Sequence, residues 1–336
     1  MPAWTPDPAR FPRFALFDGP SPLAPLPRLS SVLGRRTELW IKREDLLPLA
    51  FGGNKLRSLE YLVGAALAEG AGCLVTTGRR WSNHARLTAA AGALAGLPVH
   101  LVLSGPPTDP PNPGIGLDKL LGATIHQAAT ADRDERTALL ERVVADLRDG
   151  GHRPSVIATG GSSVIGAVGQ VMAGLELVAQ AAAQDVPFDA LVVPSATGGT
   201  HAGLLVGVRT AGSATVVRGV AVTPIEDVRP AIGRLLGELA GVPELAAVDS
   251  SEIVLDETQL GEGYGRRTAA ADEATRLLAR TEGILVDPIY TAKALAGLVA
   301  EVRSGRLDGM RAVFWHAGGT PGLFEPLDPS VDGVTQ

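Results

Sequence analysis

The order of apolar and polar residues divides the chain into short strands and longer helices. Apolar residues recur three and four positions apart at Leu56, Leu59, Val63, Ala66 and Leu67, the spacing of a half-buried helix. Similar patterns predict helices at about 82–95, 131–147, 165–183 and 289–304. Short aliphatic runs predict buried strands at 73–77, 99–103, 155–158, 190–194, 216–222 and 312–315. This alternation indicates an α/β fold with open, twisted, mostly parallel sheets flanked by helices.

Composition and charge narrow the class of protein. The chain has 336 residues, enough for two α/β lobes with a ligand between them. Hydrophobic residues make up 45% and charged residues 20%, which excludes a largely disordered chain. The formal charge of −6 argues against binding to nucleic acid or to an anionic membrane. The single cysteine, Cys73, cannot form an internal disulfide, and no apolar run resembles a signal sequence or membrane span, so we expect a cytoplasmic protein.

A lysine follows a glycine pair directly before the first expected helix, in the segment Phe51-Gly-Gly-Asn-Lys55. Asn54 is expected to cap this helix, and the glycines allow another chain segment to approach closely. The positive end of the helix dipole disfavours an ammonium at Lys55 and so favours the neutral amine. A neutral amine can attack an aldehyde and form a Schiff base. A solvated lysine at a helix start has the same local pattern, so both interpretations stay open here.

Two other expected strands run into helices through short polar or glycine-rich turns. In the first, Ser82 is expected to cap a helix whose amides attract a carboxylate, with Asn83 and His84 beside it. In the second, the loop Thr197-Gly-Gly-Thr200 is typical of a backbone cradle for a phosphate. An ordinary helix cap and a chance glycine-rich loop are the alternatives for these two patterns.

Late segments of the chain present tyrosines at turns. Tyr264 lies in the turn Gly261-Glu-Gly-Tyr-Gly265, and Tyr290 and Thr291 lie where a helix is expected to begin. A tyrosine hydroxyl can serve as an acid, a base or a carboxylate partner, and a ring that seals the edge of a lobe is the alternative. The six histidines show no metal-ligand spacing, so we expect no metal site.

Taken in order, these segments resemble the fold-type II pyridoxal-phosphate enzymes, specifically the 1-aminocyclopropane-1-carboxylate deaminase/D-cysteine desulfhydrase group. The motifs that carry the resemblance begin at Ile41, Ala50, Ser82, Thr197, Gly263, Asp287 and His316. The resemblance implies a two-lobed, tryptophan synthase β-like fold, with a larger pyridoxal-phosphate-binding domain at 1–60 plus 165–336 and a smaller α/β domain at 61–164. It also implies pyridoxal 5'-phosphate as cofactor, a small amino acid as substrate and a homodimer, with no nucleic-acid or membrane partner.

The resemblance also implies roles for individual residues. Lys55 would bind the cofactor's aldehyde carbon, Asn83 would face its phenolic oxygen, and Ser82 would hold the substrate carboxylate. The implied catalytic residues are Lys55, Ser82, Tyr264 and Tyr290; those of the cofactor site are Lys55, Asn83, Thr197, Gly198, Gly199, Thr200 and Thr291; those of the substrate site are Trp81, Ser82, Asn83 and His84.

Four positions differ from the family pattern. Thr291 stands where the deaminases have glutamate and His84 where they have glutamine, and both differences favour the desulfhydrase branch. That branch has threonine in place of Ala317, however, and Trp81 replaces the usual glutamine. We expect a lyase or deaminase that acts on a small amino acid, D-configured or β-substituted, and releases ammonia and a 2-oxo acid. The alternatives are β-replacement, racemisation or tailoring of an unusual amino acid with the same cofactor, and a non-catalytic phosphate-ligand-binding protein on the same fold.

Overall fold

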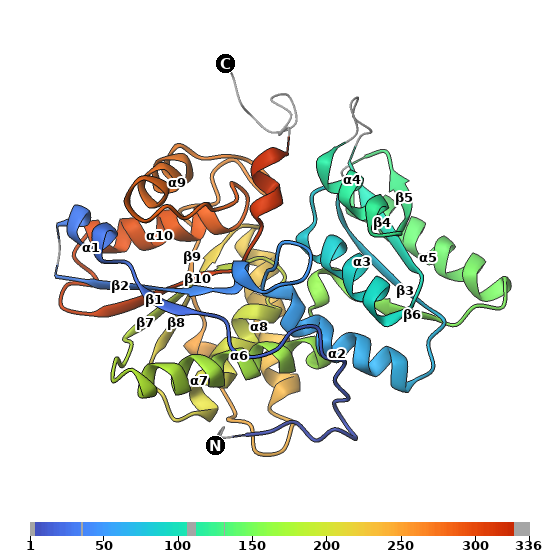
Figure 1. Cartoon of the computed structure of the whole chain (residues 1–336), viewed down its shortest axis with the longest axis horizontal. Helices are drawn as coiled ribbons and strands as arrows, with labels where there is room; N and C mark the ends of the chain where they lie inside the picture. Colours follow the sequence, from blue (N-terminus) through green and yellow to red (C-terminus); the bar gives the residue numbers. More distant parts are fainter. Residues whose placement is uncertain (1–3, 35, 106–111, 131, 326–336) are drawn as a thin grey trace.

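Two open sheets lie side by side in the protein, each between layers of helices (Figure 1). The computed structural model describes residues 4–34, 36–105, 112–130 and 132–325. One sheet has six strands and the other has four, and helices cover both faces of each. The predicted α/β architecture with mostly parallel sheets is confirmed.

The larger sheet has the strand order β1-β2-β10-β7-β8-β9, and every neighbouring pair is parallel except β1 with β2. Its central strands are buried on both faces, which explains their continuous apolar sequences. The strands are β1 (Leu23–Pro25), β2 (Glu38–Arg43), β7 (Ala190–Ser195), β8 (Val216–Ala221), β9 (Val254–Asp256) and β10 (Arg311–His316). One face is covered by α1 (Pro27–Leu33), α9 (Ala269–Glu282) and α10 (Thr291–Arg303), the other by α6 (Val164–Ala183), α7 (Gly199–Thr210) and α8 (Ile225–Leu239).

The smaller sheet has four parallel strands in the order β5-β4-β3-β6. The strands are β3 (Cys73–Arg79), β4 (Val99–Ser104), β5 (Thr124–Ala128) and β6 (Pro154–Ile157). One face packs on α2 (Lys55–Ala68), α3 (Asn83–Ala95) and α4 (Pro113–Leu120), and the other on α5 (Arg133–Asp149). The domain boundaries expected after residues 60 and 164 fall outside the strands of both sheets and stay predictions.

Helix α6 lies at the centre of the larger half. It is long and apolar enough to span a membrane, and 61% of its apolar window is buried inside the protein. No other helix in the described ranges has this length and composition. It packs against α7 and against α2 of the smaller half, so its apolar sequence serves the core that joins the halves.

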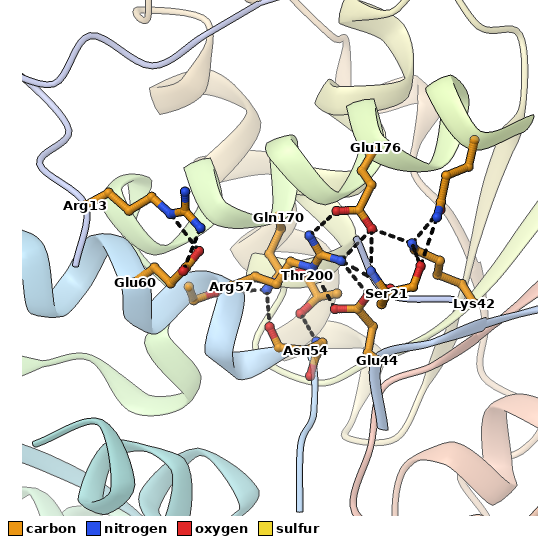
Figure 2. Close-up of polar contacts among 12 residues, drawn as sticks. Arg13, Ser21, Lys42, Glu44, Asn54, Arg57, Glu60, Gln170, Glu176 and Thr200 are labelled. Atoms are coloured by element: carbon orange, nitrogen blue, oxygen red, sulfur yellow. Dashed lines mark hydrogen bonds and ion pairs between the residues drawn. The ribbon is translucent and has the colours of Figure 1, made fainter. Parts of the chain in front are cut away.

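A buried ion network fastens the start of α2 to the larger half. Figure 2 shows Arg57 between two carboxylates: its Nε donates to Glu44 at 2.7 Å and its Nη1 to Glu176 at 2.6 Å. Lys42 also forms an ion pair with Glu176, so two cations balance two carboxylates. The Glu44 side chain is fully buried and that of Arg57 is 5% exposed. Arg57 lies two residues after Lys55 and therefore fixes the helix turn that carries this lysine.

Removing Arg57 should destabilise the protein strongly, because Glu44 and Glu176 would keep buried charges without their main partner. We expect Arg57→Met to lower the free energy of unfolding by about 3–5 kcal/mol, measured by urea denaturation. Arg303→Met is the matched control, since Arg303 pairs with Glu273 at the surface, where both side chains are about half exposed. Equal denaturation midpoints for the two variants would contradict a structural role of the network.

Candidate active site

A cavity of about 650 Å³ lies between the two halves, a size that suits a cofactor together with a small substrate. The segments after β3, β6, β7, β8 and β10 contribute to its lining, so it lies at the carboxyl ends of strands from both sheets. The cavity brings together ten of the residues predicted from the sequence: Lys55, Ser82, Asn83, His84, Thr197, Gly198, Thr200, Tyr264, Tyr290 and Thr291. Gly199 and Trp81, the remaining two, lie behind this lining.

The loop before α2 turns tightly to place Lys55 in the cavity. Four consecutive residues, 50–53, have positive φ, from 45° to 126°. A Cβ on Gly52 would lie 2.5 Å from the carbonyl oxygens of Asp45 and Leu47, so this position accepts only glycine. Backbone strain of this kind persists where the surrounding contacts impose it, and it is common at functional sites.

Asn54 holds the start of α2 against the glycine loop of the larger half. Its side chain does not cap α2, contrary to the prediction. Instead, Asn54 Nδ2 donates to Thr200 Oγ1 at 2.7 Å (Figure 2), and its main-chain N–H donates to the carbonyl of Ala317 at 3.0 Å. Gln170 of α6 donates to the Asn54 carbonyl at 2.8 Å. Asn54 therefore connects α2 to α6 and α7 and does not cap α2.

Lys55 is the lysine best placed to react with an aldehyde. The sequence has four lysines: Lys42 is paired with Glu176, Lys293 donates to two carbonyls and Lys119 is exposed. The side chain of Lys55 has no hydrogen-bond partner among the described residues. Burial lowers the pKa of Lys55 to about 8. At pH 7 about one molecule in ten then carries the neutral amine, against about one in three thousand for an ordinary lysine.

The loop before α7 is shaped to hold an anion. Gly198 has φ of 84°, and α7 begins at Gly199. A Cβ on Gly198 would lie 3.0 Å from the backbone of α8, and one on Gly199 would lie 2.9 Å from Ser162 Oγ, so the loop packs too closely for side chains. Thr197, Gly198 and Thr200 line the cavity from this loop and from the start of α7. Free amides at a helix N-terminus are the usual protein partners of a phosphate.

The start of α3 offers a second place for an anion. Ser82 caps this helix as predicted, because its Oγ accepts the N–H of Ala85 at 3.2 Å. Asn83 Oδ1 accepts a hydrogen bond from Arg86 Nη1 at 2.6 Å, and Arg86 is itself held by the carbonyl of Ala50. With its oxygen occupied, the Asn83 amide presents its NH₂ group as a donor. That donor suits an oxyanion such as a phenolate.

His84 is a neutral histidine whose tautomer follows from its neighbours. The hydroxyl of Thr76 donates to the carbonyl of Ile157 at 2.9 Å, so His84 Nε2, 3.0 Å from the same oxygen, must carry the proton and donate to it. His84 Nδ1 is then an acceptor, buried and without a partner among the described residues. Burial and the nearby charge of Lys55 lower the pKa of His84 to about 3. His84 therefore offers a lone pair at the cavity rather than a charge.

Two tyrosines contact each other at the wall of the cavity. The hydroxyls of Tyr264 and Tyr290 share a hydrogen bond, and burial raises the pKa of both groups. Both rings therefore keep their protons at neutral pH, and the pair retains one O–H that can donate elsewhere. The turn that carries Tyr264 is held by Lys293 of α10, whose buried Nζ donates to Leu260 O at 2.7 Å and Gly263 O at 3.1 Å.

Trp81 packs against Tyr264, which lines the cavity. The two rings are tilted against each other with centroids 6.4 Å apart. The guanidinium groups of Arg79 and Arg80 lie 5.3 and 4.9 Å from the indole ring. Since Trp81 is 6% exposed, its bulk fixes the position of Tyr264.

Thr291 is tied into the start of α10. Its hydroxyl donates to Asp287 Oδ1 at 2.6 Å and accepts the main-chain N–H of Asp287 at 2.9 Å. Asp287 Oδ2 also accepts the N–H groups of Ile289 and Tyr290, so this buried carboxylate caps the helix. The hydroxyl proton of Thr291 is thus already used, and a role for Thr291 toward the cofactor stays a prediction.

Sequence reasoning missed several residues that support the site. Four of them are distant in the chain and reach the site only through the fold: Arg133, Arg136, Gln170 and Lys293. The others, Arg86, His201 and Asp287, lie within three residues of predicted site residues. His201 follows the phosphate-type loop directly and could have been found there. It is buried, and burial lowers its pKa to about 4.

A phosphorylated aldehyde would meet a partner for each of its reactive groups in this cavity: an amine for the carbonyl carbon and helix amides for the phosphate. The chain thus falls in the class of α/β proteins that bind such a cofactor through a lysine. A sequence profile of the family described as pyridoxal-phosphate dependent enzyme matches residues 14–318, and the chain belongs to this family. Pyridoxal phosphate is therefore its cofactor, and the alternative of a non-catalytic binding protein is excluded.

Relatives and solved structures agree with this assignment. The D-cysteine desulfhydrase of Salmonella choleraesuis (strain SC-B67) is 42% identical over 323 residues, covering 94% of this chain and 96% of the relative. That of Salmonella typhi is 41% identical with the same coverage. A crystal structure of an ACC deaminase homologue has a TM-score of 0.82 and 35% identity, covering 94% of both chains. A T.th. threonine deaminase, at 24% identity and a TM-score of 0.65, covers 93% of this chain and shares the fold. The predicted fold-type II architecture is confirmed.

The lowered pKa of Lys55 predicts how cofactor binding depends on pH. Only the neutral amine attacks an aldehyde, so the rate at which cofactor-free protein captures pyridoxal phosphate should rise with pH and level off above about pH 9. The visible absorbance of the bound cofactor follows this rate in a stopped-flow experiment. A rate that still climbs about tenfold between pH 8 and pH 9 would mean that Lys55 has the pKa of an exposed lysine.

Lys293 should act as a positioning residue for Tyr264. In Lys293→Met the carbonyls of Leu260 and Gly263 lose their shared donor, so the turn that carries Tyr264 can shift. We expect kcat/KM to fall about tenfold to a hundredfold while the absorbance of the bound cofactor is unchanged. Lys119→Met, at an exposed site on α4, is the control and should keep full activity. Loss of cofactor from Lys293→Met would indicate a general structural role instead.

Proposed function

We propose that this enzyme is a lyase of the D-cysteine desulfhydrase type. It converts a small β-substituted amino acid into a 2-oxo acid and ammonia; for cysteine, one water is consumed and pyruvate, ammonia and hydrogen sulfide are formed. The Salmonella relatives support this substrate class, since they carry that name at 41–42% identity. The observation that carries the proposal is the position of Lys55: an amine whose pKa is lowered by burial shares one cavity with the anion-binding start of α3 and with two protonated tyrosines.

The residues of the cavity fit pyridoxal phosphate. Lys55, with no other partner among the described residues, would bind the aldehyde carbon. The loop 197–200 and the first turn of α7 would hold the phosphate, and the NH₂ group of Asn83 would donate to the phenolic oxygen. When bound, pyridoxal phosphate withdraws electrons from the bonds at the substrate's α-carbon. The observation that supports this fit most directly is the glycine loop before α7, which packs so closely on α8 and Ser162 that it accepts no side chains.

Residues of the chain would bind the substrate and transfer its protons. Ser82 and the first amides of α3 would bind the substrate carboxylate, which orients the α-carbon. The Lys55 amine would take the proton from that carbon, because a pKa of about 8 makes it a base near neutral pH. The free O–H of the Tyr264–Tyr290 pair would give a proton to the departing β-substituent. His84 Nδ1 would accept an N–H from Lys55 and keep its lone pair directed at the substrate.

Two sequence features favour a second candidate: β-replacement, racemisation or tailoring of an unusual amino acid with the same cofactor. Trp81 packs against the Tyr264 ring and restricts its position. Ala317 lines the cavity with a methyl group where the desulfhydrase branch has the hydroxyl of a threonine. Either change alters which bond of the substrate is favoured for cleavage rather than the use of the cofactor.

Assembly, location and domain boundaries complete the proposal. A homodimer is supported by the resemblance to the desulfhydrase group and by two apolar side chains near the site, Leu46 and Phe51, that are 54% and 59% exposed. A cytoplasmic location is supported by the single buried, unpaired cysteine, Cys73. The domains proposed are 1–60 with 165–336, and 61–164.

Lys55→Ala tests the proposal directly. The wild-type protein is given D-cysteine, D-serine, L-serine and 1-aminocyclopropane-1-carboxylate separately, and release of ammonia, sulfide and 2-oxo acid is measured. We expect D-cysteine to release all three, and Lys55→Ala to lose at least about 10³-fold in rate with its circular dichroism unchanged. Added methylamine should restore part of the lost rate by replacing the missing base. A fully active Lys55→Ala variant would overturn the assignment of this lysine.

A further inference from the structure

Three arginines line the cavity beside the tyrosine pair. Arg79 lies at the end of β3, and Arg133 and Arg136 lie in the first turns of α5. The Arg79 guanidinium is 5.9 Å from the ring centre of Tyr264, and Arg136 Nη1 donates to Ser104 Oγ at 3.0 Å. β3 and α5 pack against each other, so their arginines share the wall of the cavity that carries Tyr264.

The two arginines of α5 bring positive charge to this wall without a carboxylate to balance it. Arg133 and Arg136 form no ion pair with any described residue, and the buried Nε of Arg136 has no hydrogen-bond partner among them. Burial, and then the charges of Arg79 and Arg133, lower the pKa of Arg136. A guanidinium that lies beside other cations and keeps an unused N–H favours an anionic ligand. The anion would reduce the repulsion between the cations and accept the hydrogen bond.

Several acidic residues of the described chain lie near this cavity, and most of them bond to backbone groups or hydroxyls rather than to the arginines. Asp287 lines the cavity but caps α10 with both of its carboxylate oxygens. Asp227 belongs to α8, the helix that packs on the loop before α7. At the start of α5, Asp132 accepts the N–H groups of Asp134 and Glu135, and Glu135 Oε2 accepts the hydroxyl of Thr130; all of these groups are exposed. None of the carboxylates in the described ranges forms an ion pair with Arg133 or Arg136.

We propose that the substrate carries a second anion at the end of its side chain, a sulfonate or a phosphate ester, and that Arg136 binds this anion together with Arg79 and Arg133. The inference rests on the proposed function and narrows its substrate class. The α-carboxylate lies at the start of α3, held by Ser82, and the second anion lies on the arginine wall, which begins three residues earlier at Arg79. Neutral amino acids such as cysteine and serine fill the same site but leave this wall without a ligand.

The reaction balances for a leaving anion on the β-carbon. The proton of the α-carbon goes to Lys55, the bond from the β-carbon to the substituent breaks with its electron pair on the substituent, and one water is consumed. A β-sulfonate yields pyruvate, ammonium and hydrogen sulfite; a β-phosphate ester yields pyruvate, ammonium and inorganic phosphate. An arginine wall favours such leaving groups, because the negative charge that develops on them is stabilised where it forms.

An unreactive ligand tests the binding step separately from turnover. The probe is 3-sulfopropanoate, which has both anions but no amino group, with butanoate as the singly charged comparison. Calorimetry on the holoenzyme at fixed ionic strength should show 3-sulfopropanoate binding at least about tenfold more tightly than butanoate. Arg136→Met should remove this difference, and Arg142→Met, at an exposed site on the same helix, should preserve it. Equal affinities of the wild-type protein for the two probes would overturn the proposal.

Turnover separates this inference from the proposed function and identifies the anion. The wild-type holoenzyme is compared on 3-sulfoalanine and O-phosphoserine, in both configurations, against D-cysteine and serine, with the change in cofactor absorbance recorded for each. We expect one acidic amino acid to have at least tenfold higher kcat/KM than the neutral ones, and Arg136→Met to reduce only that value. Preference for a neutral amino acid, or equal losses on both kinds, would overturn the anion site while leaving the lyase proposal intact. If no amino acid is turned over or changes the absorbance, the proposed function itself fails.

Discussion

Lys55 has to be buried enough to lose its proton near neutral pH and yet keep no partner of its own, and this requirement shapes the interior around it. An unpaired cation in a buried cavity disfavours its charged form, which is why burial lowers the pKa of Lys55 to about 8. The helix that starts with such a residue needs other contacts to hold it in place. Arg57 supplies them two residues later, since its paired charge joins α2 to Glu44 and to Glu176 of α6. The ion pairs of Arg57 hold α2 in position, and the unpaired amine of Lys55 is the group that reacts.

The cavity collects the positive ends of two helices that belong to different halves of the molecule. Helix α7 follows a strand of the larger sheet and presents the loop with Gly198, whereas α3 follows a strand of the smaller sheet and presents Ser82. Amides at both helix starts favour anions, and the arginines at β3 and α5 add charge of the same sign. A ligand with several anionic groups therefore bridges the halves, and its binding stabilises them against each other.

Much of the fold and of the site could be predicted from the sequence because the signals are local. The buried strands appear as apolar runs, and the lysine, the serine cap and the glycine loop each follow a strand or precede a helix in the chain. Edge strands such as β1 and β5 were missed, since short, partly polar strands lack a clear pattern. Asn54 was assigned as a cap on local grounds, but its side chain bonds to Thr200, 146 residues away. Arg136 and Lys293 reach the site only through tertiary structure, and no spacing in the sequence marks them.

Identification of the lysine that binds the cofactor tests the central claim most directly. The holoenzyme is treated with borohydride, which makes the bond between lysine and cofactor permanent, then digested and mapped by mass spectrometry. Since the chain has four lysines, the result is one of four peptides or none. The structure predicts the cofactor on Lys55 alone, because it is the one lysine that lines the cavity among the described residues. A cofactor found on Lys42, Lys119 or Lys293, or on no lysine, would contradict the account.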